Sequence, residues 1–379
     1  MSGRILFVSS NATHLRNFHI PYIAALQERG YTVDAACAPD EKGVPQVDQL
    51  YALSFVKKMI APQNFAAVLQ LRKLLLEKRY DFMCCHTSLA AYFARLAALS
   101  LGKKRPVICN MMHGYLFDEK TNPLKRALLA SAEVQTKGVT DLLLTMNRWD
   151  TDYAKARGLG RRIAFIPGVG VRFERFDAVS QAEGAAFRAE LGVDREQFLL
   201  VYAAEFSPRK NQETLIRAMA ELPGEVVLAL PGQGELWESC RTLAAELGVA
   251  ERVIFPGLVS NVPHWYRAAD AAVSSSRSEG LPFNVMEAMY CALPVVATEV
   301  KGHTDLIENG VSGFLFPFGD SAALAAHIRT LCSDRARSTA MGMAARQQVL
   351  PYGLETVLPQ VLQEYLSCLP ETKEVTANG

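Results

Sequence analysis

The chain has 379 residues, half of them apolar, and a formal net charge of +1. This length exceeds one ordinary core and indicates two domains, since domains usually hold about 100–200 residues. The longest apolar runs are far shorter than the roughly 20 residues that span a bilayer, and the first residues lack the apolar region of a signal peptide. Eight scattered cysteines without a C-x-x-C pair favour buried free thiols over a disulfide framework. We therefore expect a cytoplasmic protein.

The small net charge conceals an asymmetry between the two halves of the chain. Residues 1–170 contain 23 lysines and arginines against 13 acidic residues, whereas residues 171–379 contain 17 against 26. One interpretation is drift in solvated surface charge. We favour a basic first domain that meets an anionic membrane surface or acceptor, since each basic residue near a leaflet contributes about 1 kcal/mol. Nucleic acid is not an expected partner, because the sequence contains no recognisable nucleic-acid-binding module.

Strand patterns alternate with helical patterns through the first half of the chain. Apolar strand patterns occupy residues 4–9, 32–37, 82–86, 107–112, 142–145 and 163–166. Helical patterns occupy residues 18–28, 65–78, 88–101, 124–135 and 149–157. Strands that alternate with helices of this length indicate a parallel sheet with crossover helices.

The same alternation restarts in the second half, after a Pro/Gly stretch at residues 167–170 that suits a linker. The expected strands are residues 199–204, 226–231, 253–255, 271–274 and 295–298, and the expected helices are residues 212–222, 235–247 and 284–290. We predict an α/β protein with two Rossmann-like, doubly wound parallel-sheet domains that face a cleft. The predicted parts are a first Rossmann-like domain at 1–170, a second at 171–352, a helix at 353–369 that returns to the first domain, and a flexible tail at 370–379.

A pair of glutamates eight residues apart is the strongest functional signal. Glu279 lies in a loop after an expected strand, and Glu287 lies inside the helix that follows. Gly280 allows close approach of the backbone to a ligand, and a helix N-terminus attracts a diphosphate. The alternative is an ordinary helix with Asn284 or Ser278 as its cap.

Three further loops follow expected strands. Arg209 and Lys210 form a basic turn that suits a pyrophosphate, although an isolated Arg-Lys pair is more often a solvated turn. Gly232 belongs to a G-x-G sequence, which by itself is weak evidence for a ligand site. The third loop, Val259–Asn261, follows a strand that ends at Gly257, which would set the base of a nucleotide against backbone groups.

Together these motifs resemble the family-4 retaining glycosyltransferases of the GT-B fold. The resemblance covers residues 199–316, including the E-x7-E pair, the basic turn and the downstream sequence 292–298. It is closest to bacterial capsular and exopolysaccharide glycosyltransferases. It implies transfer of a sugar, with retention of configuration, from a nucleotide-diphosphate sugar (UDP-sugar favoured) to a glycan or a polyprenyl-diphosphate-linked acceptor.

The resemblance also implies roles for individual residues. Arg209 and Lys210 would hold the donor diphosphate with help from Gly280 and Leu281, and Glu287 would bind the ribose. Glu279 would contact the transferred sugar. In the first domain, His113 follows an expected strand and would assist at the reacting centre, although a lone histidine is more often structural.

Two departures from the family pattern stand out. Glu205 occupies a position where many members carry arginine, so it should pair with Arg209 or point elsewhere. The first loop reads Ser9–Pro21 in place of a glycine pair, and its His14, Arg16 and His19 are candidates to bind the acceptor or the donor phosphate.

We expect no metal and no cofactor. Asp150 and Asp152 match a D-x-D metal motif, but they follow Asn147 at the start of an expected helix, so capping explains them better. Two other functions remain open. A sugar-nucleotide epimerase of the same fold would act on the donor alone, and a non-catalytic sugar-nucleotide-binding protein would not turn it over. The favoured location is cytoplasmic, with peripheral attachment to the inner face of the cell membrane.

Overall fold

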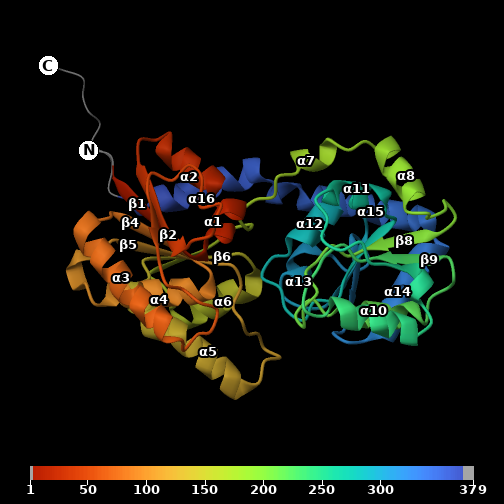
Figure 1. Ribbon diagram of the computed structural model, residues 1–379, viewed down its shortest axis with the longest axis horizontal. Helices are drawn as coiled ribbons and strands as arrows, with labels where there is room; N and C mark the ends of the chain where they lie inside the picture. Colours follow the sequence, from red (N-terminus) through yellow and green to blue (C-terminus); the bar gives the residue numbers. More distant parts are fainter. Residues whose placement is uncertain (1–2, 370–379) are drawn as a thin grey trace. The chain divides into compact units, whose positions relative to one another are not determined.

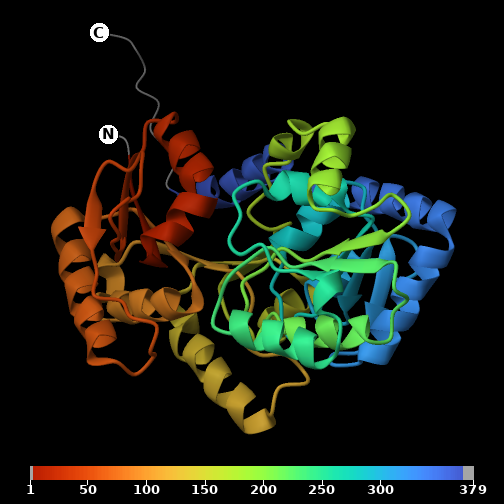
Figure 2. The ribbon, with the colours of Figure 1, turned by 45° about the vertical axis from the view of Figure 1, so that its right-hand side comes forward.

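The computed structural model describes residues 3–369, which form two compact units. The described residues up to Val169 and those from Glu355 onward make the first unit, and Gly170–Leu354 make the second. The C-terminal tail predicted at 370–379 lies outside the described residues. In each unit the strands run side by side in the middle, with helices on both faces (Figures 1 and 2).

The first unit contains seven strands: β1 (Arg4–Asn11), β2 (Thr32–Ala38), β3 (Leu50–Ala52), β4 (Phe82–His86), β5 (Val107–Met112), β6 (Leu142–Thr145) and β7 (Arg162–Phe165). Its helices are α1 (Ala12–Phe18), α2 (Ile20–Gln27), α3 (Pro62–Lys78), α4 (Ser88–Leu99), α5 (Pro123–Thr136), α6 (Arg148–Arg157) and, apart from its first residue, α16 (Leu354–Leu366). Short 3₁₀ turns are η1 (Gly102–Lys104) and η2 (Lys137–Val139).

The second unit contains six strands: β8 (Phe198–Val201), β9 (Val226–Ala229), β10 (Val253–Ile254), β11 (Ala271–Ser274), β12 (Val295–Thr298) and β13 (Gly313–Phe316). Its helices are α7 (Glu174–Asp177), α8 (Gln181–Glu190), α9 (Gln212–Met219), α10 (Trp237–Glu246), α11 (Val262–Ala268), α12 (Phe283–Tyr290), α13 (His303–Leu306), α14 (Ser321–Ser333) and α15 (Arg335–Val349). The 3₁₀ turns η3 (Ala250–Arg252) and η4 (Leu350–Tyr352) complete it.

Both sheets are parallel and doubly wound. The strand order is β3-β2-β1-β4-β5-β6-β7 in the first unit and β10-β9-β8-β11-β12-β13 in the second. In each sheet the chain moves outward from its first strand in one direction and then returns to build the other half. The crevice at this reversal, outside the carboxyl ends of the strands, is where such folds bind ligands. The predicted α/β class is therefore confirmed, and the topology marks one ligand position in each unit.

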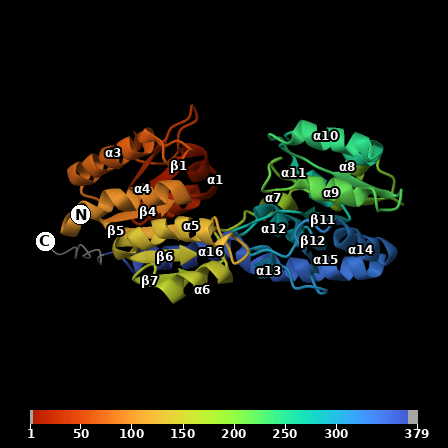
Figure 3. The ribbon, with the colours of Figure 1, turned by 90° about the horizontal axis from the view of Figure 1, so that it is seen from below.

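Alternating apolar residues place helices on both faces of the first sheet (Figure 3). Leu6 and Met83 pack on one face with residues of α3 and α4. On the other face, the ring of Tyr365 in α16 lies 6.4 Å from that of Phe7 and 5.4 Å from that of Phe82. The C-terminal helix thus closes the core of the first unit.

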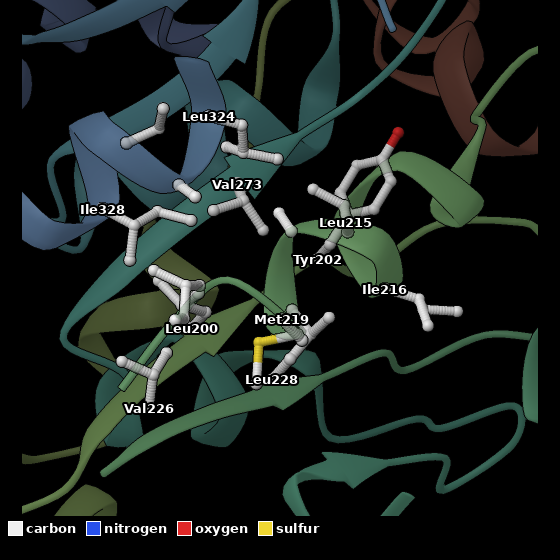
Figure 4. Close-up of a cluster of buried hydrophobic side chains, with 14 of the residues drawn as sticks. Leu200, Tyr202, Leu215, Ile216, Met219, Val226, Leu228, Val273, Leu324 and Ile328 are labelled. Atoms are coloured by element: carbon white, nitrogen blue, oxygen red, sulfur yellow. The ribbon is translucent and has the colours of Figure 1, made fainter. Parts of the chain in front are cut away.

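The second core follows the same logic. Leu200, Val226 and Leu228 pack with Leu215 and Met219 of α9 beneath the strands, as Figure 4 shows. Further members come from α14, namely Leu324 and Ile328. Full burial of each such aliphatic side chain contributes about 1.5–3 kcal/mol, so these clusters hold the strand ends in place.

The helix predicted at 18–28 is found as α2, whereas α1 ahead of it was not predicted. His19 separates the two helices, and Pro21 lies in the first turn of α2, where its missing N–H group costs no hydrogen bond. Strands β3 and β13 and the helices α14 and α15 were also not predicted. All eight cysteines lie within residues 3–369 and are free; six are buried as predicted, and Cys332 and Cys368 are half-buried.

Candidate functional site

Both predicted glutamates lie at the switch point of the second sheet. Glu279 follows β11, which neighbours β8, and Glu287 lies in the second turn of α12. Each residue is only 8 % exposed. A buried carboxylate is tolerated only when it is paired or protonated, so the surroundings of the two glutamates define their chemistry.

Glu279 is held by both cations of the basic turn. Lys210 Nζ donates to Glu279 Oε1 at 2.6 Å, and Arg209 Nη1 donates to Oε2 at 3.0 Å. Burial by itself raises the pKa of Glu279, but the charges of Lys210 and Arg209 outweigh it and hold the pKa at about 2. The carboxylate is therefore ionised at neutral pH, and the three side chains together carry one net positive charge.

Backbone contacts fix the basic turn against the loop after β11. Ser275 Oγ lies 3.0 Å from the carbonyl oxygen of Lys210 and 2.7 Å from that of Asn211. The Arg277 N–H donates to the Arg209 carbonyl at 2.8 Å. Asn211 has a φ of 53°, in the left-handed region that asparagine tolerates better than most residues. The two cations are thus positioned before any ligand binds.

Glycines allow neighbouring strand-end loops to touch. A Cβ atom on Gly232 would lie 1.9 Å from the carbonyl oxygen of Ala204, and one on Gly302 would lie 2.7 Å from that of Gly280. Gly302 also has a φ of 84°, which strongly favours glycine. The loops after β8 and β9 therefore contact each other at Gly232, where a larger residue would not fit. A tight turn by itself would not explain the glycine.

A cavity of about 380 Å³ opens beside these loops. It is lined by Ala203, Ala204, Glu205, Pro231, Gly232, Gln233, Leu258, Val259, Val262 and Glu287. The structure thus brings together Gly232, Val259 and Glu287, three of the residues predicted to bind the ligand. Asn261 is not among the lining residues, and its side-chain oxygen accepts a hydrogen bond from Trp265 Nε1 at 3.3 Å.

Glu287 contacts Arg175 of α7, a residue that the sequence analysis did not single out. Burial raises the pKa of Glu287 to about 7, and the opposing effect of Arg175 is limited because its side chain is half exposed. Near neutral pH this carboxyl is therefore divided between its two protonation states. Glu279, in contrast, is always charged.

The helix that carries Glu287 is not capped in the way the alternative interpretation required. Its N-cap is Pro282, which offers no side-chain hydrogen bond. Asn284 instead donates to the Ala203 carbonyl at 3.3 Å. Capping therefore does not explain why Ser278, Glu279 and Asn284 stand here.

His303 is a second residue at this site that sequence reasoning missed. Its Nδ1 lies 2.8 Å from the Thr298 carbonyl oxygen and its Nε2 lies 3.1 Å from Ser274 Oγ. Burial lowers its pKa to about 4, so it is neutral. The signal in the sequence was its position directly after an expected strand and Gly302.

The predicted residues of the first unit gather at the other switch point. His14 Nε2 lies 3.3 Å from His113 Nε2 and 3.3 Å from His19 Nε2. His86, at the end of β4, completes a cluster in which one ring nitrogen from each of the four histidines lies within 4.8 Å of the others. The sequence analysis selected three of the four and missed His86, although its place at the end of an expected strand matched that of His113.

Other predicted residues lie apart from these clusters. Arg16 forms an ion pair with Asp40 at 2.9 Å. Glu205 is exposed at the cavity rim. Arg209, which was expected as its possible partner, forms an ion pair with Glu279 instead. Asn147 caps α6 by accepting from the Asp150 N–H at 2.8 Å, which confirms capping as the explanation for the D-x-D sequence.

Comparison with protein families matches both halves of the chain. The family profile described as "Glycosyl transferases group 1" matches residues 185–348. The profile described as "Glycosyl transferase 4-like" matches residues 4–144. The two matches fall on the second and first units respectively, so each sheet carries its own part of the likeness.

Individual proteins extend this likeness to the full length. EpsD of Bacillus subtilis (strain 168), which carries the name of a glycosyltransferase, is 34 % identical over 382 residues, covering 99 % of both chains. The Escherichia coli UDP-Gal:alpha-D-GlcNAc-diphosphoundecaprenol alpha-1,3-galactosyltransferase is 24 % identical over 68 % of each chain. The solved structure of Anabaena Alr3699/HepE in complex with UDP and glucose aligns with a TM-score of 0.77 at 21 % identity, covering 96 % of this chain and 100 % of that one.

Proposed function

This chain belongs to the group 1, family-4 type glycosyltransferases of the GT-B fold, and from that premise we propose that it moves a sugar from a nucleotide-diphosphate sugar to a glycan or lipid-linked acceptor in bacterial surface polysaccharide synthesis. The observation that carries the proposal is the network of half-exposed Arg209, buried Lys210 and buried Glu279 at the switch point between β8 and β11. A preorganised cationic turn in this position suits a leaving diphosphate.

The donor occupies the second unit in this proposal. Arg209 and Lys210 contact the diphosphate, and the backbone at Gly280 and Leu281, just ahead of α12, assists them. In this arrangement the cations neutralise the diphosphate charge without a metal. Glu287 lines the cavity and binds the ribose hydroxyls there. Arg175 would release one oxygen of the Glu287 carboxylate, which then accepts a hydrogen bond from the ribose.

The base of the nucleotide faces Val259 and the backbone near Asn261, and Gly232 also lines this cavity. A UDP-sugar is favoured. Support comes from HepE, whose structure is described with UDP and glucose, and from the E. coli galactosyltransferase, whose name specifies UDP-Gal.

Transfer retains the anomeric configuration in this proposal. The bond from the anomeric carbon to the phosphate oxygen breaks, the bond to the acceptor oxygen forms on the same face, and the acceptor proton passes to the departing phosphate. Because Glu279 is ionised, it suits stabilisation of positive charge on the sugar and does not suit the role of a general acid. His113 assists at the reacting centre through its backbone carbonyl or ring.

The acceptor is a glycan or a polyprenyl-diphosphate-linked sugar, with His14 and His19 of the first unit as candidate contacts; Arg16 remains a weaker candidate because Asp40 already holds it. Helix α5 supports a membrane location, since Leu124 is 82 % exposed and Leu128 is 72 % exposed beside Lys125 and Arg126. None of the helices between residues 3 and 369 is long and apolar enough to cross a bilayer. We place the enzyme in the cytoplasm, attached to the inner face of the cell membrane.

The experiment has two stages. Thermal-shift screening of UDP-, GDP- and ADP-sugars identifies the donor, because a ligand at 100 times its dissociation constant stabilises the protein by about 2.7 kcal/mol. The selected donor is then incubated with and without a polyprenyl-diphosphate-linked sugar, and the products are resolved by NMR.

Each outcome selects one function. Sugar transfer that requires the acceptor, with an unchanged anomeric configuration, supports the proposal. Conversion of the donor by itself identifies an epimerase. Donor binding without turnover under any acceptor condition identifies a non-catalytic binding protein.

A further inference from the structure

The four-histidine cluster of the first unit has a geometry that ordinary hydrogen bonding explains poorly. His14 Nε2 has two Nε2 neighbours, one on His19 and one on His113, both at 3.3 Å. A neutral imidazole offers one N–H donor and one lone pair, so a single nitrogen cannot donate to one neighbour and accept from the other. Two ring nitrogens that approach a third in this way would be better satisfied by a shared partner.

His86 strengthens this conclusion because it has no hydrogen-bond partner of its own. The residue is fully buried, and neither of its ring nitrogens has a hydrogen-bond partner among residues 3–369. His19 is also fully buried, and its Nδ1 is unpaired. Buried polar atoms in folded proteins are nearly always satisfied, so unpaired imidazole nitrogens at one position point to a ligand.

Protonation of the histidine rings does not account for their unpaired nitrogens. Burial lowers the pKa of His14 to about 4. Burial and the neighbouring rings lower the pKa values of His19, His86 and His113 well below the usual range. In its neutral form each ring presents one lone pair that a cation can accept.

We propose that His14, His19, His86 and His113 form a binding site for Zn²⁺. Zinc–imidazole bonds are about 2.0–2.1 Å long, so the nitrogens of a tetrahedral site lie about 3.3–3.4 Å apart. The separations of His14 Nε2 from His19 Nε2 and from His113 Nε2, both 3.3 Å, equal that edge. One ring nitrogen from each of the four histidines lies within 4.8 Å of the others, and zinc prefers such nitrogen ligands over the oxygen sets used by magnesium and calcium.

The elements that present these rings are well supported. His86 ends β4 and stacks on Phe7 of β1, with ring centroids 5.4 Å apart and an interplanar angle of 17°. His113 directly follows β5. His14 belongs to α1, whose first turn is capped by the Asn11 side chain, and His19 lies between α1 and α2. Bound zinc would tie the segment after β1 to the ends of β4 and β5.

This site departs from the sequence-based expectation of no metal. The four histidines are separated by 5, 67 and 27 residues in the chain, a spacing that matches no zinc motif. Four neutral ligands leave both charges of the ion uncompensated at the switch point of the first sheet. The site therefore also supplies a positive charge where an anionic acceptor group would bind, although the zinc proposal does not depend on the proposed function.

The test uses untagged, full-length protein that is stripped with a chelator and dialysed. Titration with Co²⁺ should give about one equivalent bound per chain, with the intense visible bands of tetrahedral cobalt, and Zn²⁺ should abolish those bands by displacement. The variant His86→Asn should weaken Co²⁺ and Zn²⁺ binding by about tenfold or more. His327→Asn, which removes a histidine of the second unit, should bind both metals as the unaltered chain does.

Several results would overturn the proposal. Cobalt that binds without tetrahedral bands, or that binds His86→Asn as tightly as the unaltered chain, would show that the cluster is a hydrogen-bonded group of neutral rings. If His86→Asn does not fold, the spectrum of the unaltered chain still decides the question. Donor binding is measured separately with the stripped protein, so a failure of the zinc proposal is distinguishable from a failure of the proposed function.

Discussion

The two switch points share one topology but hold opposite kinds of chemistry. In the second unit, two cations hold an ionised glutamate whose pKa is about 2. In the first unit, four imidazoles converge whose pKa values all lie below the usual range. Parallel sheets wound in the same order have therefore created one charged site and one neutral site.

The difference shows that the fold supplies only the position. Carboxyl ends of neighbouring parallel strands meet at one edge of a sheet, so any polar residues placed just after them are brought together. What the site can do then depends on the side chains that stand there. The following predictions test that contrast, beginning with the charged site.

If Glu279 acts as proposed, Glu279→Gln should reduce sugar transfer by about 10²–10³-fold, because it removes the negative charge that stabilises the reacting sugar. The amide keeps the shape of the side chain, so the melting temperature separates loss of catalysis from loss of fold. Glu213→Gln is the matched control, since Glu213 forms an exposed pair with Arg217 in the same unit. Near-normal turnover by Glu279→Gln would remove this residue from the site.

Lys210→Met should weaken binding of UDP by about 10–100-fold, since hydrogen bonds to charged groups contribute about 1.5–3 kcal/mol. Isothermal titration calorimetry with UDP measures the change. Arg217→Met removes an exposed cation of α9 and should leave the affinity unchanged. Equal affinity of Lys210→Met and the unaltered protein would place the diphosphate elsewhere.

Glu287 should make stability depend on pH. Its folded pKa of about 7 lies above the ordinary value of 4.5, so its contribution is fully present below about pH 4.5 and is lost as the pH rises through 7. Relative to Glu287→Gln, the unaltered protein should lose about 2 kcal/mol between about pH 5.5 and 8, or about 4–8 °C in melting temperature.

The same titration should affect the donor, because only an ionised Glu287 accepts hydrogen bonds from both ribose hydroxyls. UDP should therefore bind more tightly as the pH rises through 7 in the unaltered protein and not in Glu287→Gln. If the unaltered protein and Glu287→Gln show the same pH dependence of stability and of UDP affinity, the pKa assigned to Glu287 is contradicted.

The double variant Leu124→Ser with Leu128→Ser should reduce binding to anionic vesicles by about 100-fold or more, because each leucine buried in a membrane contributes on the order of 1.5–3 kcal/mol. Vesicle flotation measures the change. Met343→Ser, which alters an exposed apolar residue of the second unit, is the control. Binding that the leucine changes leave intact, or that does not depend on anionic lipid at any salt concentration, would contradict membrane attachment through α5.

Much of the fold was predictable because local patterns determine it. Strands β4, β5, β6, β11 and β12 were predicted with their observed bounds. Strands β3 and β13 were missed, although the short edge strands β7 and β10 were predicted to within a residue or two. The charged site was also predictable in part, because Glu279, Gly280, Arg209 and Lys210 all directly follow strands along the chain.

Arg175 and His86 could not be assigned in the same way. Arg175 lies 112 residues from Glu287, and nothing in its local sequence distinguishes it from other surface arginines. His86 is separated from His14 by 72 residues, and only the pairing of β1 with β4 brings the strand ends that carry them together.

The sequence by itself determined the doubly wound class of both units, the positions of the strand-end loops and the residue types that occupy them. Periodicity and strand-end chemistry are local properties, so they can be read along the chain. The tertiary structure decided which of these residues are neighbours, which are buried, and therefore which are charged. Those properties depend on strand order and packing, and they turned a list of glutamates and histidines into one ionised network and one neutral cluster.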